Sequence, residues 1–186
     1  SQWRPIKDNI DGAAEWDLRW QVGMPPKADM ARIDGSRFFN HITCNGCVTV
    51  KSALADTLSR LTERLSISHG AGHPATRCSH FIPQTYSMPR DHADYLAAVT
   101  ADPDALWMLK PKNSSRGRGI RLLTDPAAAP TDDQWLIQHY MADPHLIDGR
   151  KYVLRVYVLI RGIEPLRVYR YVQGFAKLAS HAYTLD

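Results

Sequence analysis

The spacing of apolar residues along the chain predicts two helices. Leucines recur at steps of three or four over residues 51–65, which places them on one face of a helix, and Thr49 is expected to cap its start. A second helix is expected over residues 91–101. It should end at Asp102-Pro103, because the residue before a proline is disfavoured in helical backbone.

Short runs rich in β-branched and aromatic residues predict the strands. The clearest is residues 152–160, which a turn over 161–165 joins to a hairpin partner at 166–172. Shorter strands or irregular elements are expected at residues 16–22, 38–50, 106–110, 120–123 and 135–140. Residues 66–79 lack a period and are expected to form a loop that divides the chain into an N-terminal α/β subdomain, residues 1–80, and a second region, residues 81–186. The fold class expected for the chain is α/β (α+β), with mixed and antiparallel sheets flanked by helices.

A polar loop between two of the expected strands has a composition that suits an anion. The first strand ends in Lys110, and the loop that follows carries Arg116, Gly117 and Gly119. Such a loop can close its backbone N–H groups and its cations over a polyphosphate. A lysine that closes a buried strand usually has a specific partner. We therefore expect ATP binding here, with chemistry that uses the γ-phosphate.

The strand over residues 152–160 carries a second set of cations. Alternation places Lys151, Val153, Arg155 and Tyr157 on one face, with about 13 Å along the strand between the two cations. Two cations on one side of a central strand are costly unless an anion meets them, and a nucleotide polyphosphate would suit. The alternative is an edge strand whose cations face water.

Composition and charge narrow the class of protein. The 186 residues suffice for one domain or two small ones, and no run of 18 apolar residues predicts a membrane span. The N-terminus lacks the apolar core of a signal peptide, and three cysteines without one favour the cytosol. The net charge is +4, but residues 148–177 carry seven Lys or Arg against two acidic residues. That segment predicts an anionic ligand or an acidic partner, unless it is simply a solvated basic face.

The Cys44-Asn-Gly-Cys47 spacing raises the question of a metal site. Further ligands could come from His69, His73, Cys78 and His80. The gap from Cys47 to His69 is long for a zinc finger, and a second pair of cysteines is absent. The sequence also lacks a Gly-x-Ser-x-Gly element and a P-loop. We therefore assign no metal ligands to these residues.

Several segments follow one another in an order that resembles the tubulin–tyrosine ligase-like family, whose members have an ATP-grasp fold. The resemblance covers roughly residues 38 to 180 and rests on the serial order of the segments. They are Phe39-Asn-His41, Lys51 before the leucine-rich helix, Phe81-Ile-Pro-Gln-Thr-Tyr-Ser-Met-Pro89, Trp107-Met-Leu-Lys-Pro111 with Ser114-Ser-Arg-Gly-Arg-Gly-Ile120, Ile137-Gln-His-Tyr-Met141, Pro144 to Val158, Pro165 to Tyr169, and Gly174 to Ala179.

The resemblance implies an ATP-dependent carboxylate–amine ligase. Such enzymes phosphorylate a carboxylate and let an amine attack the acyl phosphate, which forms an amide or isopeptide bond. The implied cofactors are ATP and Mg²⁺. The implied partners are tubulin or another acidic protein tail and a free amino acid, with neither nucleic acid nor a membrane. The implied location is the cytoplasm, at the cytoskeleton or a cilium.

The same resemblance assigns roles to individual residues. Contacts with ATP fall to Lys51, Lys110, Arg116, Gly117, Gly119 and Lys151, and the adenine pocket to Gln138, His139 and Met141. Arg155 would neutralise phosphate or the acyl-phosphate transition state. Lys177 stands where the family usually has an arginine that grips the amino-acid substrate.

Two departures from the family pattern open alternatives. The family has Phe-Asp-Leu-Arg after the lysine, whereas Val153 here replaces the aspartate. The magnesium-binding Asp, Glu and Asn are expected beyond residue 186, so the ATP-grasp region is expected to be incomplete at its C-terminus and residues 1–186 alone are not expected to catalyse ligation. One alternative is a catalytically inactive ligase-like module that binds microtubules or another acidic partner. Another is an ATP-grasp ligase that acts on a small peptide or metabolite.

Overall fold

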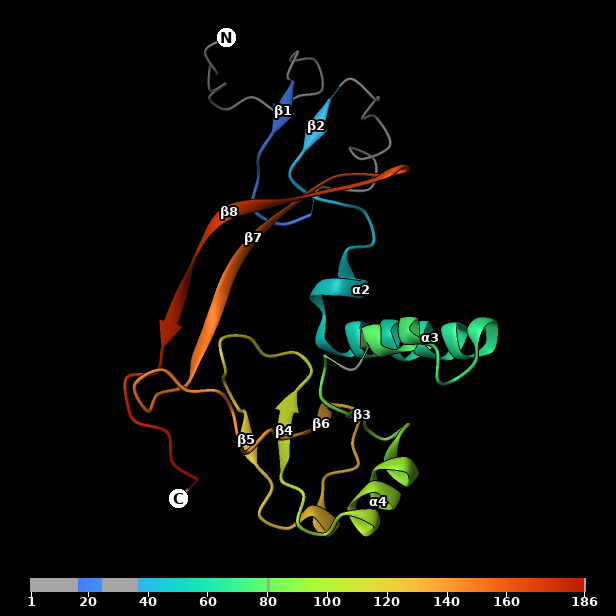
Figure 1. Ribbon diagram of the computed structural model, residues 1–186, viewed down its shortest axis with the longest axis vertical. Helices are drawn as coiled ribbons and strands as arrows, with labels where there is room; N and C mark the ends of the chain where they lie inside the picture. The colour runs from blue at the N-terminus through green and yellow to red at the C-terminus, as the bar shows by residue number, and fades with distance from the viewer. Residues whose placement is uncertain (1–16, 25–36, 80, 186) are drawn as a thin grey trace. The chain divides into compact units, whose positions relative to one another are not determined.

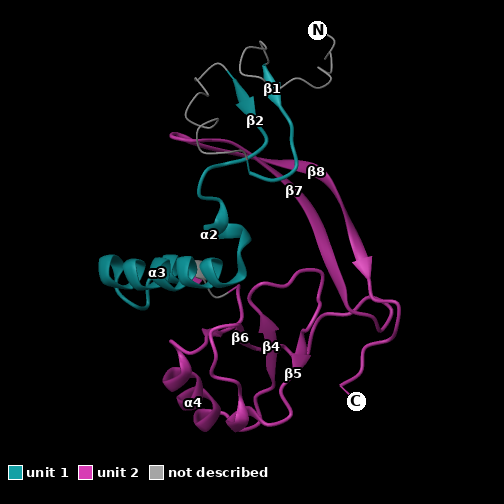
Figure 2. Ribbon diagram, turned by 180° about the vertical axis from the view of Figure 1, so that it is seen from behind, with its two compact units in different colours: residues 1–76 teal, residues 77–186 magenta. Residues whose placement is uncertain are grey.

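The structure is a computed structural model that describes residues 17–24, 37–79 and 81–185, without the side chains of residues 78 and 79 (Figure 1). The chain divides into two compact units, residues 1–76 and residues 77–186 (Figure 2). Some parts of the sequence predictions lie outside the described residues. They are Trp16, the Cys78 side chain, His80 and the N-terminal residues considered for a signal peptide.

In the first unit, a short parallel pair of strands is fixed by side chains that follow the second strand. β1 (Leu18–Arg19) pairs with β2 (Phe38–Phe39). Asn40 then exchanges two hydrogen bonds with the backbone of Gln21. Its Oδ1 accepts from the Gln21 N–H at 3.1 Å, and its Nδ2 donates to the Gln21 carbonyl at 2.9 Å. His41 Nε2 lies 3.0 Å from the same carbonyl, so the Phe39-Asn-His41 segment anchors the chain that leaves β1.

Two consecutive helices follow in this unit. α2 (Gly46–Thr49) precedes α3 (Lys51–His69), so Lys51 begins the leucine-rich helix. The prediction that Thr49 caps this helix is wrong, because Thr49 ends α2 and its hydroxyl donates to the carbonyl four residues earlier at 3.0 Å. Val50 takes the cap position in extended backbone. The helix also runs four residues beyond the predicted range, to His69, and is followed by Gly70 with a φ of +89°. The loop predicted over residues 66–79 is therefore shorter, because its first four residues are helical and residues 74–79 form a 3₁₀ turn.

The second unit contains a four-stranded antiparallel sheet in the order β3-β6-β4-β5. The element bounds are β3 (Thr85–Ser87), α4 (His92–Ala101), β4 (Trp107–Pro111), β5 (Arg121–Leu122) and β6 (Trp135–His139), with 3₁₀ turns η1 (Pro74–Ser79) and η2 (Pro126–Ala128). The sequence pattern did not predict β3, which is only three residues long. The helix expected over residues 91–101 is confirmed as α4.

An aromatic cluster joins α4 to one face of this sheet. The rings of Tyr95 and Trp107 meet edge to face with centroids 5.2 Å apart, and Tyr86 lies 5.6 Å from Tyr95. Leu109 and Ile137 from neighbouring strands complete the buried cluster, and both have no exposed surface. Burial of these large side chains is the main apolar contribution to the unit.

Strand pairing separates this cluster from a second, more polar face. Leu109 pairs with Ile137, and Met108 pairs with Gln138. Since paired residues in antiparallel strands share a face and neighbours alternate, Lys110 and Gln138 lie on the face away from α4. Thr85, which pairs with Gln138, lies on that face too.

A long hairpin follows the sheet. β7 (Tyr152–Ile163) pairs antiparallel with β8 (Leu166–Leu178), and only residues 164 and 165 separate them, where a turn of five residues was predicted. The pairing shifts register between Val156 and Val158. At this irregularity Gly174 passes so close to β7 that a Cβ atom would lie 2.4 Å from the Arg155 carbonyl oxygen. β8 ends at Leu178 and is thus longer than the strand over residues 166–172 that the sequence predicted.

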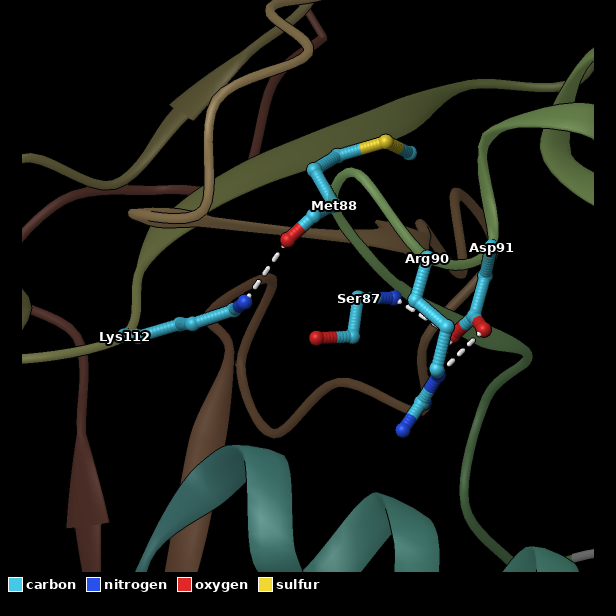
Figure 3. A network of polar contacts seen from close by, with 5 residues as sticks. All are labelled: Ser87, Met88, Arg90, Asp91 and Lys112. Atoms are coloured by element: carbon cyan, nitrogen blue, oxygen red, sulfur yellow. Dashed lines mark hydrogen bonds and ion pairs between the residues drawn. The ribbon is translucent and has the colours of Figure 1, made fainter.

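A polar network fixes the turn between β3 and α4 and the start of the loop after β4 (Figure 3). The Asp91 carboxylate accepts from the backbone N–H of Ser87 at 2.8 Å and from Arg90 at 2.6 and 2.8 Å. Lys112 donates to the carbonyl of Met88 at 2.8 Å. The hydrogen bond from Arg90, together with the bond from Ser87 and the nearby positive charges, outweighs burial and holds the pKa of Asp91 below its ordinary value.

Replacement of Asp91 by alanine should lower the free energy of unfolding by about 1–3 kcal/mol at pH 7, because the buried Ser87 N–H loses a charged acceptor. The pKa of Asp91 is lower in the folded state, so its contribution is present above pH 3.8 and fades as the pH falls through the lower native value. Urea titrations from pH 7 to pH 2 would measure this. Asp104→Ala, at an exposed loop aspartate, is the control. Equal stability losses in both variants would contradict the assignment.

Replacement of Gly174 by alanine should loosen the hairpin, because the added methyl group cannot fit beside the Arg155 carbonyl. Overpacking of this kind costs about 1–3 kcal/mol. Hydrogen–deuterium exchange of β7 and β8 should accelerate. Gly162→Ala in the same hairpin, where the nearest atom would be 3.5 Å away, should change little. Unchanged exchange in Gly174→Ala would show that the backbone relaxes at the bulge.

Candidate nucleotide-binding site

A row of hydrogen bonds crosses the sheet face opposite α4. Lys110 Nζ donates to Gln138 Oε1, and Gln138 Nε2 donates to Thr85 Oγ1 at 2.7 Å. The Thr85 hydroxyl donates in turn to the carbonyl of Pro83 at 2.8 Å. Because an ammonium can only donate, the amide oxygen of Gln138 faces Lys110 and its amide nitrogen faces Thr85. The half-buried ammonium of Lys110 thus occupies a fixed place beside β6.

The end of β6 also binds the second predicted lysine. The Tyr140 N–H donates to the Leu106 carbonyl at 2.8 Å, which extends the pairing with β4 by one residue. Gln138 and Tyr140 therefore belong to the same face by alternation. Lys151 Nζ donates to the Tyr140 hydroxyl and lies 4.3 Å from the centroid of its ring. Lys110 and Lys151, both predicted to bind phosphate, are thus hydrogen-bonded to Gln138 and Tyr140, which lie two residues apart at one end of β6.

A second tyrosine encloses the same ammonium. Tyr183, in the segment after β8, has its ring centroid 4.3 Å from Lys151 Nζ. The Tyr140 hydroxyl donates to Tyr183 at 3.3 Å, and the Tyr183 hydroxyl donates to the Ala142 carbonyl at 2.7 Å. These bonds leave the lone pairs of Tyr140 directed at Lys151.

The electrostatics of the two phenols differ. Burial acts to raise the pKa of Tyr140, but hydrogen bonds with Lys151 and Tyr183 and the lysine charge outweigh it, so this pKa lies below 10. Burial, followed by the bond and charge of Tyr140, raises the pKa of Tyr183 to about 12. The lowered pKa of Tyr140 thus reflects a favourable interaction between its hydroxyl oxygen and the Lys151 ammonium.

The hairpin presents three of the predicted cations on one face. Val153 pairs with Lys177, and Arg155 pairs with Phe175. The rings of Tyr157 and Phe175 lie 6.4 Å apart, which agrees with the predicted face of β7. By alternation, Lys151, Arg155 and Lys177 share this face. Arg155 and Lys177 are exposed, and their side chains make no hydrogen bond or ion pair with any described residue.

The loop between β4 and β5 adopts backbone that favours glycine. Gly117 and Gly119 have φ values of +77° and +73°, and Arg116 has a φ of +59°. A Cβ atom at Gly119 would lie 2.8 Å from the ring of Pro111, whereas one at Gly117 would meet open space. Gly119 therefore allows the loop to close against the end of β4, and Arg116 remains exposed at its tip.

The predicted adenine-binding residues fall on different sides of the sheet. The His139 ring packs edge to face on Trp107 with centroids 5.5 Å apart, on the α4 side, whereas Gln138 lies on the opposite face. The N–H groups of His139 and Tyr140 already donate to the carbonyls of Gln84 and Leu106, both at 2.8 Å. Met141 is 61 % exposed. His139 can therefore take part only through its backbone carbonyl, not through its side chain.

Lys51 belongs to the first unit, where it is the half-buried first residue of α3. Cys44 and Cys47 are free and exposed. Within the described ranges, no group of three or more His, Cys, Asp or Glu side chains is placed to hold a metal ion.

Sequence reasoning missed two residues that shape this site. Thr85 orients Gln138 from β3, and it lies in a segment on which the family resemblance rests. Tyr183 encloses Lys151 from beyond β8. The contact between Tyr140 and Tyr183 spans 43 residues, so no local pattern in the sequence could have indicated it.

Comparison with known proteins identifies the fold. A crystal structure titled as the C-terminal domain of K. lactis Pby1, an ATP-grasp enzyme that interacts with the mRNA decapping enzyme Dcp2, matches with a TM-score of 0.56 and 17 % identity. The match covers 90 % of this chain and 49 % of that one. The predicted ATP-grasp architecture, with helices and antiparallel sheets, is thereby confirmed.

Curated relatives carry names that refer to tubulin modification. The chain is 33 % identical over 172 residues to human "Tubulin polyglutamylase TTLL5", covering 92 % of this chain and 13 % of the relative. It is 27 % identical over 202 residues to "Probable alpha-tubulin polyglutamylase Ttll1" of Tetrahymena thermophila, covering 97 % and 49 %. The chain thus spans about half the length, or less, of these relatives.

Among the helices of the described residues, none has the length and apolar character needed to cross a membrane. The profile described as the tubulin-tyrosine ligase family matches residues 31–186, most of the chain. The resemblance seen in the serial order of sequence segments is confirmed, and the chain belongs to the tubulin-tyrosine ligase family.

Proposed function

We propose that this protein is part of an ATP-dependent ligase that joins an amino acid to tubulin or a similar acidic protein tail. The observation that carries the proposal is the attachment of Lys110 and Lys151 to Gln138 and Tyr140, at one end of β6 and away from the aromatic core. Two cations attached to one end of a strand raise the positive potential there, which favours an anionic ligand. The ATP-grasp fold supports a nucleotide as that anion.

The residues present fit ATP at this place. Lys110 and Lys151 would contact phosphates or the base, and Arg116 with the glycines of the β4–β5 loop would close over them. The carbonyl of His139, the amide of Gln138 and the exposed Met141 would meet the adenine. The role of Lys51 in phosphate binding is proposed on the family resemblance alone. ATP supplies the phosphoryl group that activates the substrate carboxylate, and Mg²⁺ would offset the charge of its phosphates.

The exposed cations of the hairpin fit the remaining steps. Arg155 would neutralise the negative charge that develops when the activated carboxylate reacts with the amine. Lys177, diagonal to Arg155 on the same face, would hold the carboxylate of the incoming amino acid.

The names of the relatives favour glutamate as that amino acid and tubulin as the acceptor. The proposed location is then the cytoplasm, at the cytoskeleton or a cilium, with residues 81–186 as the nucleotide-binding region and residues 1–80 as the N-terminal subdomain.

A non-catalytic acidic-tail binder is the second candidate. Val153 supports it, because this apolar residue faces Lys177 where the family has an aspartate that could accept hydrogen bonds from the nucleotide. Under this alternative the basic hairpin face binds an acidic tail without turnover. Microtubule pelleting that depends on salt but not on ATP would favour the binder, whereas ATP-dependent glutamate incorporation would exclude it.

Lys110→Met should raise the dissociation constant for Mg·ATP about tenfold or more, since a charge-assisted contact to phosphate is lost. Isothermal titration calorimetry of the protein would measure it. Arg121→Met is the matched control, because Arg121 is an exposed cation in β5 on the opposite face of the same sheet. Equal affinities of wild type and Lys110→Met would remove this lysine from the site, and the absence of ATP binding by wild type would refute the proposed function.

In the complete enzyme, Arg155→Met should lower kcat of glutamate incorporation by roughly 10²–10³-fold while leaving ATP affinity within about threefold, because its charge acts on the reacting groups. Incorporation of radiolabelled glutamate into tubulin, with ATP titrations alongside, would measure both. Arg167→Met, near the tip of the hairpin, is the control for net charge. A similar loss in both variants would mean that Arg155 contributes only to general attraction of an acidic partner.

A further inference from the structure

The Lys151 ammonium is enclosed by two aromatic rings from distant parts of the chain. Its Nζ lies 4.3 Å from the centroids of both Tyr140 and Tyr183. Cation–π contacts are favourable within about 6 Å of a ring centroid. One N–H of the ammonium donates to the Tyr140 hydroxyl, which leaves two for a further acceptor.

Backbone hydrogen bonds hold Tyr183 in this place. The N–H of Tyr183 donates to the Gly149 carbonyl at 2.8 Å, and the N–H of Ala179 donates to the Lys151 carbonyl at 2.7 Å. The segment after β8 is thus tied to residues on both sides of Arg150, just before β7. The position of the Tyr183 ring is therefore fixed by these backbone hydrogen bonds as well as by its contact with Lys151.

We propose that Tyr140 and Tyr183 are positioning residues that hold the Lys151 ammonium at the end of β6 for contact with the nucleotide. This proposal rests on the proposed function. A free lysine side chain has many rotamers, and ordering it on binding costs affinity. Aromatic faces order the side chain and leave its positive charge intact, whereas a carboxylate partner would neutralise it.

The direction of the hydroxyl bonds supports the same role. The Tyr140 hydroxyl donates a hydrogen bond to the Tyr183 hydroxyl, and the Tyr183 hydroxyl donates one to the Ala142 carbonyl. With its proton committed in this way, Tyr140 can act toward Lys151 only as an acceptor. The lowered pKa of Tyr140 and the raised pKa of Tyr183 agree with this assignment.

The contact itself can be tested without a nucleotide. In protein labelled with ¹³C-lysine, the ε-methylene proton signal of Lys151, identified by its loss in Lys151→Met, should be shifted upfield by the ring currents. Tyr183→Phe should keep this shift and Tyr183→Leu should reduce it. Tyr152→Leu is the matched control, because alternation directs Tyr152 to the other face of β7. A wild-type signal at the position of an exposed lysine would overturn the proposal.

The functional consequence is a change in ATP binding. Tyr183→Leu should raise the dissociation constant and the KM for ATP about tenfold, the size expected for loss of a cation–π contact in a partly buried site, with kcat at saturating ATP unchanged. Tyr140→Phe, which keeps the ring but loses the acceptor hydroxyl, should give a smaller rise. Tyr152→Leu should stay within twofold, and thermal unfolding would verify that each variant folds.

Two results of the ATP titrations test the positioning role and the proposed function separately. If wild type and Tyr183→Leu bind ATP equally well, the positioning role fails and the proposed ligase function stands. If wild type binds no ATP, the proposed function fails and this role falls with it.

Discussion

The antiparallel register between β4 and β6 is the constraint on which the rest of the second unit depends. Leu109 opposite Ile137 and Met108 opposite Gln138 divide the sheet into an aromatic face and a polar face. A shift of one residue would direct Lys110 into the cluster around Trp107 and expose that tryptophan. Burial of an unpaired ammonium costs far more than strand pairing returns, so the aromatic core and the lysine site specify the same register.

The polar face is stable because its groups satisfy one another before any ligand arrives. Gln138 accepts a hydrogen bond from Lys110 and donates one to Thr85, so the amide is fixed in one orientation. Networks in which every member is satisfied stiffen a site, whereas partly satisfied ones are costly. Two residues along a strand span about 7 Å, which is also the spacing of Gln138 and Tyr140. Their two lysines therefore form a compact positive site that an extended anion can bridge.

Local patterns in the sequence predicted the elements that local forces determine. Leucine spacing located α3, and the β-branched run located β7, because each pattern is repeated over several turns or pairs. β3 is only three residues long, and its strand character comes from pairing with β6, so it was missed. The Thr49 cap was wrong because a short helix that precedes α3 uses that residue.

Among the site residues too, local sequence patterns indicated some residues, whereas others are recognised only from contacts between distant segments. Lys110 stood out because it ends an apolar strand, and the structure gives it a defined partner. The neighbours that orient the lysines, Thr85 and Tyr183, come from segments distant in sequence and gave no local signal. The faces of Gln138 and His139 also depend on pairing with β4. Patterns along the chain can therefore suggest which cations bind, but the residues that hold them are known only from the fold.

The departure at Val153 is connected with the way Lys151 is held. In the family pattern, an aspartate follows Lys151 on the same face of the strand and could partly neutralise it. Here that position is apolar and faces Lys177, so neither lysine gains a carboxylate from it. The ammonium of Lys151 lies against the rings of Tyr140 and Tyr183, which stabilise it and leave its full charge available to an anion. The loss of the aspartate therefore raises the positive potential of this face, which favours phosphate and acidic tails alike.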